Sequence, residues 1–155
     1  MRIPDSIETD LGPFLSHCAD FIRDALVEPG HRVFVHCMLG TSRSASLVLF
    51  YMMRELNYTL RNALKHIMHQ RSPNPRAPYT HPNKGFMNQL IACEKELFGV
   101  ASLTLDAYMS REFSSGKNVS NGPVAVPKPR KRHDPQAHAR RTADSSSAGC
   151  TDADK

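Results

Sequence analysis

Residues 36–46 read HCMLGTSRSAS and separate two apolar runs, RVFV at 32–35 and LVLFYMM at 47–53. The residues at 33–35 are β-branched and aromatic, too few for a helix and apolar on both faces, so they predict a strand inside a sheet. The second run belongs to a segment that is apolar nearly all round, which predicts a buried central helix over 42–56. The quoted residues therefore form the turn between a strand and a helix.

This turn carries residue types that core packing does not require. Free backbone N–H groups and the dipole at the start of a helix favour an anion. Gly40 permits a backbone conformation in which successive N–H groups turn inward, and the guanidinium of Arg43 matches two oxygens of a phosphate. The same dipoles stabilise a thiolate, so we expect the pKa of Cys37 to be lowered. The turn predicts a phosphate site above a nucleophilic sulfur.

The stretch HCMLGTSRS at 36–44 resembles the HCxxGxSRS signature of the cysteine-dependent dual-specificity protein phosphatases, a branch of the protein tyrosine phosphatase superfamily. It is most similar to the small atypical members of that family. A second stretch, PNKGFMNQL at 82–90, resembles the family's PNxGFxxQL helix start, and a third is ADFI at 19–22. The resemblance spans about residues 3–99.

The resemblance implies hydrolysis of phosphotyrosine and phosphoserine/threonine through a phosphocysteine intermediate, with no cofactor and no metal. Cys37 would be the nucleophile and Arg43 the phosphate clamp. Ser44 would hydrogen-bond the thiolate and aid breakdown of the intermediate. Asp5, at the family's usual distance before the cysteine, would be the general acid and then the general base. Backbone N–H groups would hold the phosphate at Met38, Leu39, Gly40, Thr41, Ser42 and Arg43. Two residues would support the loop, His36 and Asn83.

Three side chains near these positions have simpler interpretations. Asp10 is a rival of Asp5, and we expect it to cap the helix that follows. Cys18 and Cys93 fall on apolar helix faces and read as core residues, with a role in resolving an oxidised Cys37 as the alternative. The histidine spacings predict no metal site, because they do not gather three ligands.

Apolar residues at helical spacing predict three further helices: one over about 13–27, one that begins at an N-cap on Thr59, and one over about 86–97 that Gly99 closes. Four prolines make 72–82 a loop, and 100–113 extends the last helix weakly. From about residue 114 large apolar side chains are almost absent, which predicts disorder. The chain is therefore expected to consist of a partial phosphatase domain over 1–111 and a basic, Ser-rich tail over 112–155.

The predicted fold class is α/β, with a central sheet flanked by helices. A strand inside a sheet needs hydrogen-bonding neighbours on both sides, yet 33–35 is the one convincing strand in residues 1–111. We therefore expect the C-terminal portion of a dual-specificity phosphatase fold, helix-rich because most upstream strands are absent. This expectation keeps a second hypothesis open, a catalytically weak or silent phosphate-binding or regulatory module.

The charge balance and the cysteines limit which partners and which cellular compartment we expect. Residues 1–111 hold twelve Lys/Arg against ten Asp/Glu, so the domain offers no basic nucleic-acid surface. Neither a secretory signal nor a membrane span is evident, and four widely spaced cysteines suit a cytoplasmic protein. The basic run at 127–133 is either a nuclear-import signal or a solvated part of the tail. A phosphoprotein is the predicted substrate. Inositol lipids and RNA are disfavoured because the turn carries no lysine between Cys37 and Arg43.

Overall fold

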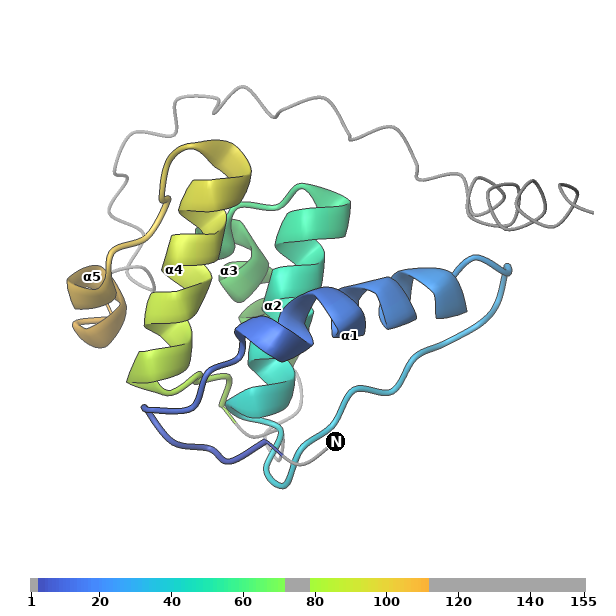
Figure 1. Cartoon of the computed structure of the whole chain (residues 1–155), viewed down its shortest axis with the longest axis horizontal. Coiled ribbons are helices and arrows are strands. Elements are labelled where there is room, and N and C mark those ends of the chain that lie inside the picture. The colour runs from blue at the N-terminus through green and yellow to red at the C-terminus, as the bar shows by residue number, and fades with distance from the viewer. Residues whose placement is uncertain (1–2, 72–78, 112–155) are drawn as a thin grey trace, which may run out of the picture.

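The computed structural model describes residues 3–71 and 79–111 of the 155. These two ranges form the helices α1 (Gly12–Ala25), α2 (Arg43–Leu56), α3 (Leu60–Arg71), α4 (Lys84–Phe98) and α5 (Leu105–Met109). In Figure 1, α2 and α4 stand side by side, α1 crosses α2, and the short α5 lies against the outer side of α4. The N-terminal loop passes beneath the start of α4, close to the start of α2.

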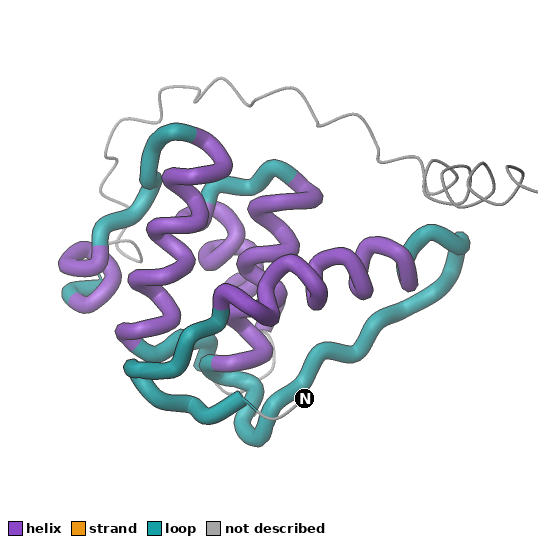
Figure 2. Tube along the Cα trace, viewed as in Figure 1, coloured by secondary structure: helices purple, strands orange, loops and turns teal. Residues whose placement is uncertain are grey.

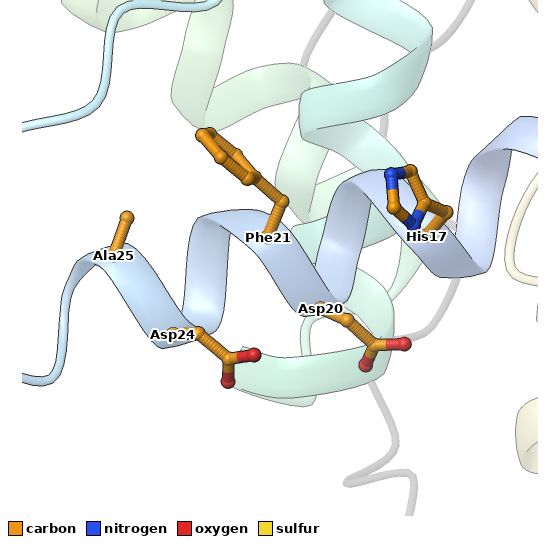
Figure 3. Close-up of a pocket in the computed structure, with 5 residues that line it drawn as sticks. All are labelled: His17, Asp20, Phe21, Asp24 and Ala25. Atoms are coloured by element: carbon orange, nitrogen blue, oxygen red, sulfur yellow. The ribbon is translucent and has the colours of Figure 1, made fainter.

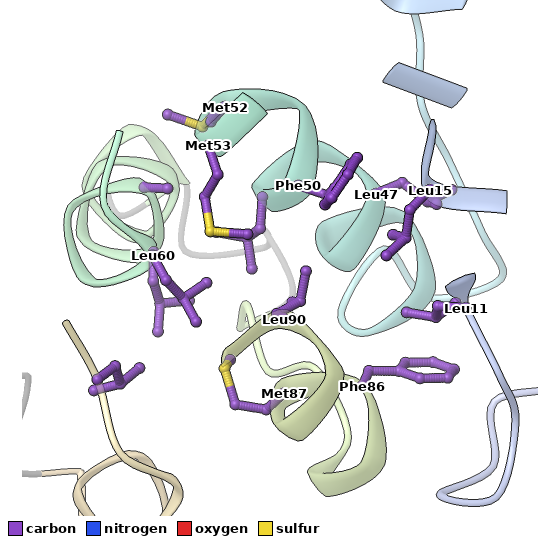
Figure 4. Close-up of a cluster of buried hydrophobic side chains, with 14 of the residues drawn as sticks. Leu11, Leu15, Leu47, Phe50, Met52, Met53, Leu60, Phe86, Met87 and Leu90 are labelled. Carbon is purple, nitrogen blue, oxygen red and sulfur yellow. The ribbon is translucent and has the colours of Figure 1, made fainter. Parts of the chain in front are cut away.

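The core lies where α1, α2, α3 and α4 meet (Figure 4). Helix α2 buries eight of its fourteen residues, which confirms the prediction of a central buried helix over 42–56. The largest apolar side chains with no exposed surface come from the first loop and from three of these helices. They are Leu11, Leu49, Met53, Leu60, Leu64, Phe86, Met87 and Leu90.

The helix ends follow local signals that the sequence carries. The Thr59 hydroxyl accepts a hydrogen bond from the backbone N–H of Asn62 (3.3 Å), which confirms the predicted cap. Gly99 ends α4 with a φ of +79°, as expected for a left-handed C-cap. Helix α4 begins at Lys84, earlier than predicted, because the side chain of Asn83 caps it by accepting from the N–H of Phe86 (3.0 Å).

The predicted strand at 33–35 is wrong. Residues 31–37 run as an irregular segment from the end of α1 back to the start of α2 (Figure 2), and the two described ranges contain no strand. Phe34 is 85% exposed, whereas a strand inside a sheet would bury it. A strand persists only where neighbours pair its N–H and C=O groups, and no described segment pairs with this one. The helix-rich character is confirmed for the described residues.

The next expectations concern the chain after α4 and the segments that the structure does not describe. The weak helix expected over 100–113 is reduced to α5, whose start is capped by the Thr104 hydroxyl. The predicted tail at 112–155, with its basic run at 127–133, lies outside the described residues, as do residues 72–78 of the predicted loop. None of the helices in the described ranges is both long and apolar enough to cross a bilayer.

A shallow hollow of about 360 Å³ opens on the surface of α1 (Figure 3). All the side chains that line it come from this one helix, and the largest, Phe21, is 64% exposed. Asp20 in its wall is bound to Arg23 (2.7 Å) and Arg54 (2.5 Å). The hollow therefore contains none of the residues that the sequence marks for chemistry.

Candidate active site

The Cys37 side chain lies at the end of the irregular segment, just before the first turn of α2. Its Sγ accepts a hydrogen bond from the backbone N–H of Gly40 (3.1 Å) and lies 3.3 Å from the Ser44 hydroxyl. Gly40 has a φ of +71°, the left-handed conformation that an inward turn of the N–H groups requires. The expected contact between Cys37 and Ser44 is thus present.

These contacts set the acidity of the thiol. Partial burial raises the pKa of Cys37, but hydrogen bonds from the hydroxyl and N–H of Ser44 and from the N–H groups of Gly40 and Leu39 outweigh it. The net result is a pKa of about 7 instead of the ordinary 9.0. A thiolate is therefore far more accessible at neutral pH than it is for an ordinary cysteine.

Replacing Ser44 tests this account of the thiol. Because its hydroxyl is the strongest group that lowers the pKa of Cys37, we expect Ser44→Ala to raise that pKa. Alkylation of Cys37 by iodoacetamide at pH 7, followed by peptide mass spectrometry, should slow by about threefold to tenfold. Ser16→Ala, an exposed change on α1, is the control. An unchanged rate in Ser44→Ala would mean that the backbone N–H groups alone set the pKa.

Two carbonyl groups of the turn, those of Gly40 and Thr41, accept hydrogen bonds from residues that the sequence analysis did not identify. The guanidinium of Arg71, at the end of α3, donates to the Gly40 carbonyl (2.7 Å) and to the Thr80 hydroxyl (3.0 Å). The N–H of His81 donates to the Thr41 carbonyl (2.9 Å). With these carbonyls bound on the outer side, the N–H groups remain directed at the sulfur. Only the tertiary structure reveals Arg71, because its sequence neighbours carry no motif.

Asp5 lies in the loop before α1 and reaches the same turn. Its Oδ1 accepts hydrogen bonds from the Ser42 hydroxyl (2.7 Å) and from the side-chain amide of Asn83 (2.8 Å). The Ser42 hydroxyl in turn accepts from the backbone N–H of Asn83 (3.0 Å). Asn83 therefore joins the loop before α1, which carries Asp5 (the Asp5 loop), to residues 37–43 (the cysteine turn). Asp10, the rival acid, instead accepts from the N–H of Gly12 (2.8 Å) at the start of α1.

Arg43 is the first residue of α2 and leans toward the Asp5 loop. Its Nε lies 3.4 Å from Asp5 Oδ2, and its Nη1 donates to the Ile3 carbonyl (3.1 Å). The guanidinium of Arg43 and the carboxyl group of Asp5 are thus paired beside the turn that holds the Cys37 thiol, although Asp5 and Cys37 lie 32 positions apart in the chain.

Residues 1–96 match the family model of the dual specificity phosphatase catalytic domain. The chain belongs to this family. Human dual specificity protein phosphatase 26 is 40% identical over 93 residues, which are 60% of this chain and 41% of that protein. Dual specificity protein phosphatase 1 of Arabidopsis thaliana is 37% identical over 97 residues, 63% of this chain and 46% of the relative. The chain thus spans less than half the length of these two relatives.

The Slingshot homolog of Xenopus laevis, a protein phosphatase by name, is also similar, with 40% identity over 90 residues, 58% of this chain and 12% of that protein. The family model covers the cysteine turn and the two residues that reach it from other segments, because Asp5 and Asn83 fall inside residues 1–96. It ends inside α4, so the last two residues of α4 and the whole of α5 lie beyond it. From there Tyr108 donates to the Pro82 carbonyl (2.8 Å), and its ring stacks on His81.

Not every residue expected at this candidate site makes a contact that matches its expected role. His36 is exposed, and its ring stacks on Phe34 with 5.1 Å between centroids, so its support of the loop stays a prediction. Met38 and Leu39 expose their side chains, and the N–H of Leu39 hydrogen-bonds the Cys37 sulfur. That the N–H of Met38 holds a phosphate stays a prediction.

The other two described cysteines pack against the core from α1 and α4 and are half-buried. Burial raises the pKa of both Cys18 and Cys93, so Cys37 is the most acidic of the three described thiols. This difference agrees with their interpretation as core residues.

Proposed function

We propose that this chain is a protein phosphatase that hydrolyses phosphotyrosine and phosphoserine/threonine residues of phosphoproteins through a phosphocysteine intermediate. The observation that carries the proposal is the convergence of three backbone N–H groups and the Ser44 hydroxyl on the Cys37 sulfur. Such groups stabilise a thiolate near neutral pH, and at the start of a helix they also suit phosphate oxygens. The relatives' printed names, all phosphatases, support the same activity.

In the first step the Cys37 thiolate attacks phosphorus, and an S–P bond forms while the bond to the leaving oxygen breaks. The N–H groups of 38–43 and the guanidinium of Arg43 bind the phosphoryl oxygens. Asp5 donates its proton to the leaving oxygen.

In the second step the Asp5 carboxylate takes a proton from water, whose oxygen attacks phosphorus. The S–P bond breaks, its electron pair returns to Cys37 as a thiolate, and inorganic phosphate leaves. The Ser44 hydroxyl, 3.3 Å from the sulfur, stabilises this leaving thiolate by a hydrogen bond. Asn83 and His36 are assigned to supporting the loop.

The family match supports a finer architecture as well. We assign residues 1–111 to the phosphatase unit and regard the described helices as the C-terminal portion of an α/β fold. A cytoplasmic site of action is part of the proposal, and the candidate import signal at 127–133 lies outside the described residues.

The test is phosphate release by the purified full chain. We expect turnover of a small aryl phosphate and of phosphotyrosine and phosphoserine peptides, with competitive inhibition by vanadate. Turnover that persists undiminished in saturating vanadate would contradict the thiolate mechanism.

The irregular course of residues 31–37 favours one second candidate, a silent phosphate-binding module. When no paired strand precedes the cysteine turn, the turn can still bind an anion, but the Cys37 sulfur is no longer held in the exact position for attack on phosphorus. For this candidate we expect the same protein to bind a phosphotyrosine peptide in calorimetry without releasing phosphate, whereas measurable release excludes it.

A further inference from the structure

The loop that carries Asp5 rests on one face of the first turns of α4. The side-chain amide of Gln89 makes two hydrogen bonds to the backbone of this loop: its Oε1 accepts from the N–H of Leu11 (2.8 Å), and its Nε2 donates to the carbonyl of Thr9 (2.8 Å). Asn83 adds a contact to the Ser6 carbonyl (3.3 Å) beside the one to Asp5. Both ends of the Gln89 amide are thus used by the loop.

Gly85 brings the loop and the helix into direct backbone contact. A Cβ atom at this position would lie 2.1 Å from the Ile7 carbonyl oxygen, a distance that no side chain tolerates. Gly85 and Gln89 are four residues apart and therefore share one face of α4. The loop lies flat on that face.

At Ile3 and Asp5 the loop is also held by the Ser42 hydroxyl and by Arg43, but the centre of the loop has few other contacts. Its one internal backbone hydrogen bond within the described residues joins the N–H of Thr9 to the Ser6 carbonyl (3.2 Å). Ile7, in the middle of the loop, is 58% exposed, whereas Ile3 and Leu11 at its ends are buried. The face of α4 therefore determines where the centre of the loop lies.

We propose that Gln89, seated beside Gly85 on this face, is a positioning residue that sets the place of Asp5 relative to the leaving oxygen above Cys37. The inference rests on the proposed phosphatase function. Proton transfer in the first step requires the acid within hydrogen-bond reach of the leaving oxygen, and a displacement of about 1 Å can lower a rate about 10²-fold. Gln89 touches no reacting atom and acts through the loop backbone.

The leaving group separates this role from a merely structural one. A nitrophenolate leaves readily without a proton, whereas a phenolate with a pKa near that of tyrosine, about 10, requires one. A misplaced Asp5 therefore slows hydrolysis of phenyl phosphate and hardly affects 4-nitrophenyl phosphate. General loosening of the cysteine turn would slow both substrates alike.

The experiment compares kcat/KM for the two substrates in the full chain. In Gln89→Met, which keeps the side-chain length and removes both hydrogen bonds, we expect a loss of about tenfold on phenyl phosphate and less than about twofold on 4-nitrophenyl phosphate. Asn88→Ala, an exposed change on the same helix, should leave both values unchanged. Gln89→Ala serves as a second variant, and hydrogen exchange at the Leu11 amide should accelerate in both Gln89 variants.

A double variant distinguishes action through Asp5 from independent damage. If Gln89 acts through the acid, Asp5→Asn/Gln89→Met should be no slower on phenyl phosphate than Asp5→Asn alone, because the loss is already complete. Multiplying losses, or equal losses on both substrates, would overturn the inference while leaving the phosphatase activity intact. Absence of turnover in the unaltered chain would overturn the proposed function and this inference together.

Discussion

The variant Cys37→Ser is expected to release no measurable phosphate, a loss of at least about 10³-fold in kcat. A serine hydroxyl is not ionised at neutral pH, so the groups that lower the pKa of Cys37 to about 7 have no thiolate to stabilise. The N–H groups and Arg43 remain in place, so phosphate binding should survive the change. Phosphate release and calorimetric binding of a phosphotyrosine peptide measure the two properties separately.

Cys18→Ser is the matched control for this prediction. It makes the same chemical change at a half-buried thiol of α1 whose pKa is raised by burial, and activity should stay near that of the unaltered chain. Retained turnover in Cys37→Ser would show that sulfur is not the nucleophile, and lost peptide binding would show that the substitution disturbs the whole turn.

The second large effect concerns stability, at a carboxylate far from the chemistry. Glu94 of α4 is 1% exposed and accepts three hydrogen bonds, from the N–H of Leu60 (2.7 Å), the N–H of Ser102 (2.8 Å) and the Ser102 hydroxyl (2.6 Å). Leu60 begins α3, so the negative charge also meets the positive end of that helix dipole. Glu94→Ala should lower the free energy of unfolding by about 3–5 kcal/mol, because it leaves buried donors without acceptors.

Urea denaturation followed by circular dichroism measures this loss. Glu96→Ala, two residues further along the same helix and exposed, should change the free energy of unfolding by less than about 0.5 kcal/mol. Glu94→Gln should fall between the two, since an amide keeps one acceptor oxygen and removes the charge. Similar urea midpoints for Glu94→Ala and Glu96→Ala would mean that water accepts the hydrogen bonds that the Glu94 carboxylate accepts in the unaltered chain.

The sequence predicts the helices better than it predicts the segment between them. Periodic apolar residues and local caps such as Thr59 and Gly99 act within a few residues, so they can be read directly. The strand at 33–35 fails because pairing depends on distant chain. Val33 and Val35 favour a strand locally, but hydrogen-bonding neighbours decide whether one forms.

The candidate site divides in the same way. The resemblance around Cys37 implies its contact with Ser44, and the structure contains this contact, because both residues lie within one short segment that leads into α2. The supports from Arg71, His81 and Gln89 reach the site from remote segments, and no local pattern marks them. Gln89 stands inside the quoted PNKGFMNQL stretch, but the sequence does not show that its amide would face the Asp5 loop.

The reach of the Gln89 contacts has a consequence for the order of folding. They join residues 78 and 80 positions apart in the chain, whereas α2 packs on α3 across a turn of three residues. Closing a longer loop costs more entropy, and distant contacts slow folding. We expect the helix pairs to assemble first and the N-terminal loop to dock last. A partly folded molecule would then have its reactive Cys37 thiol in place while Asp5, the proposed general acid, is not yet positioned.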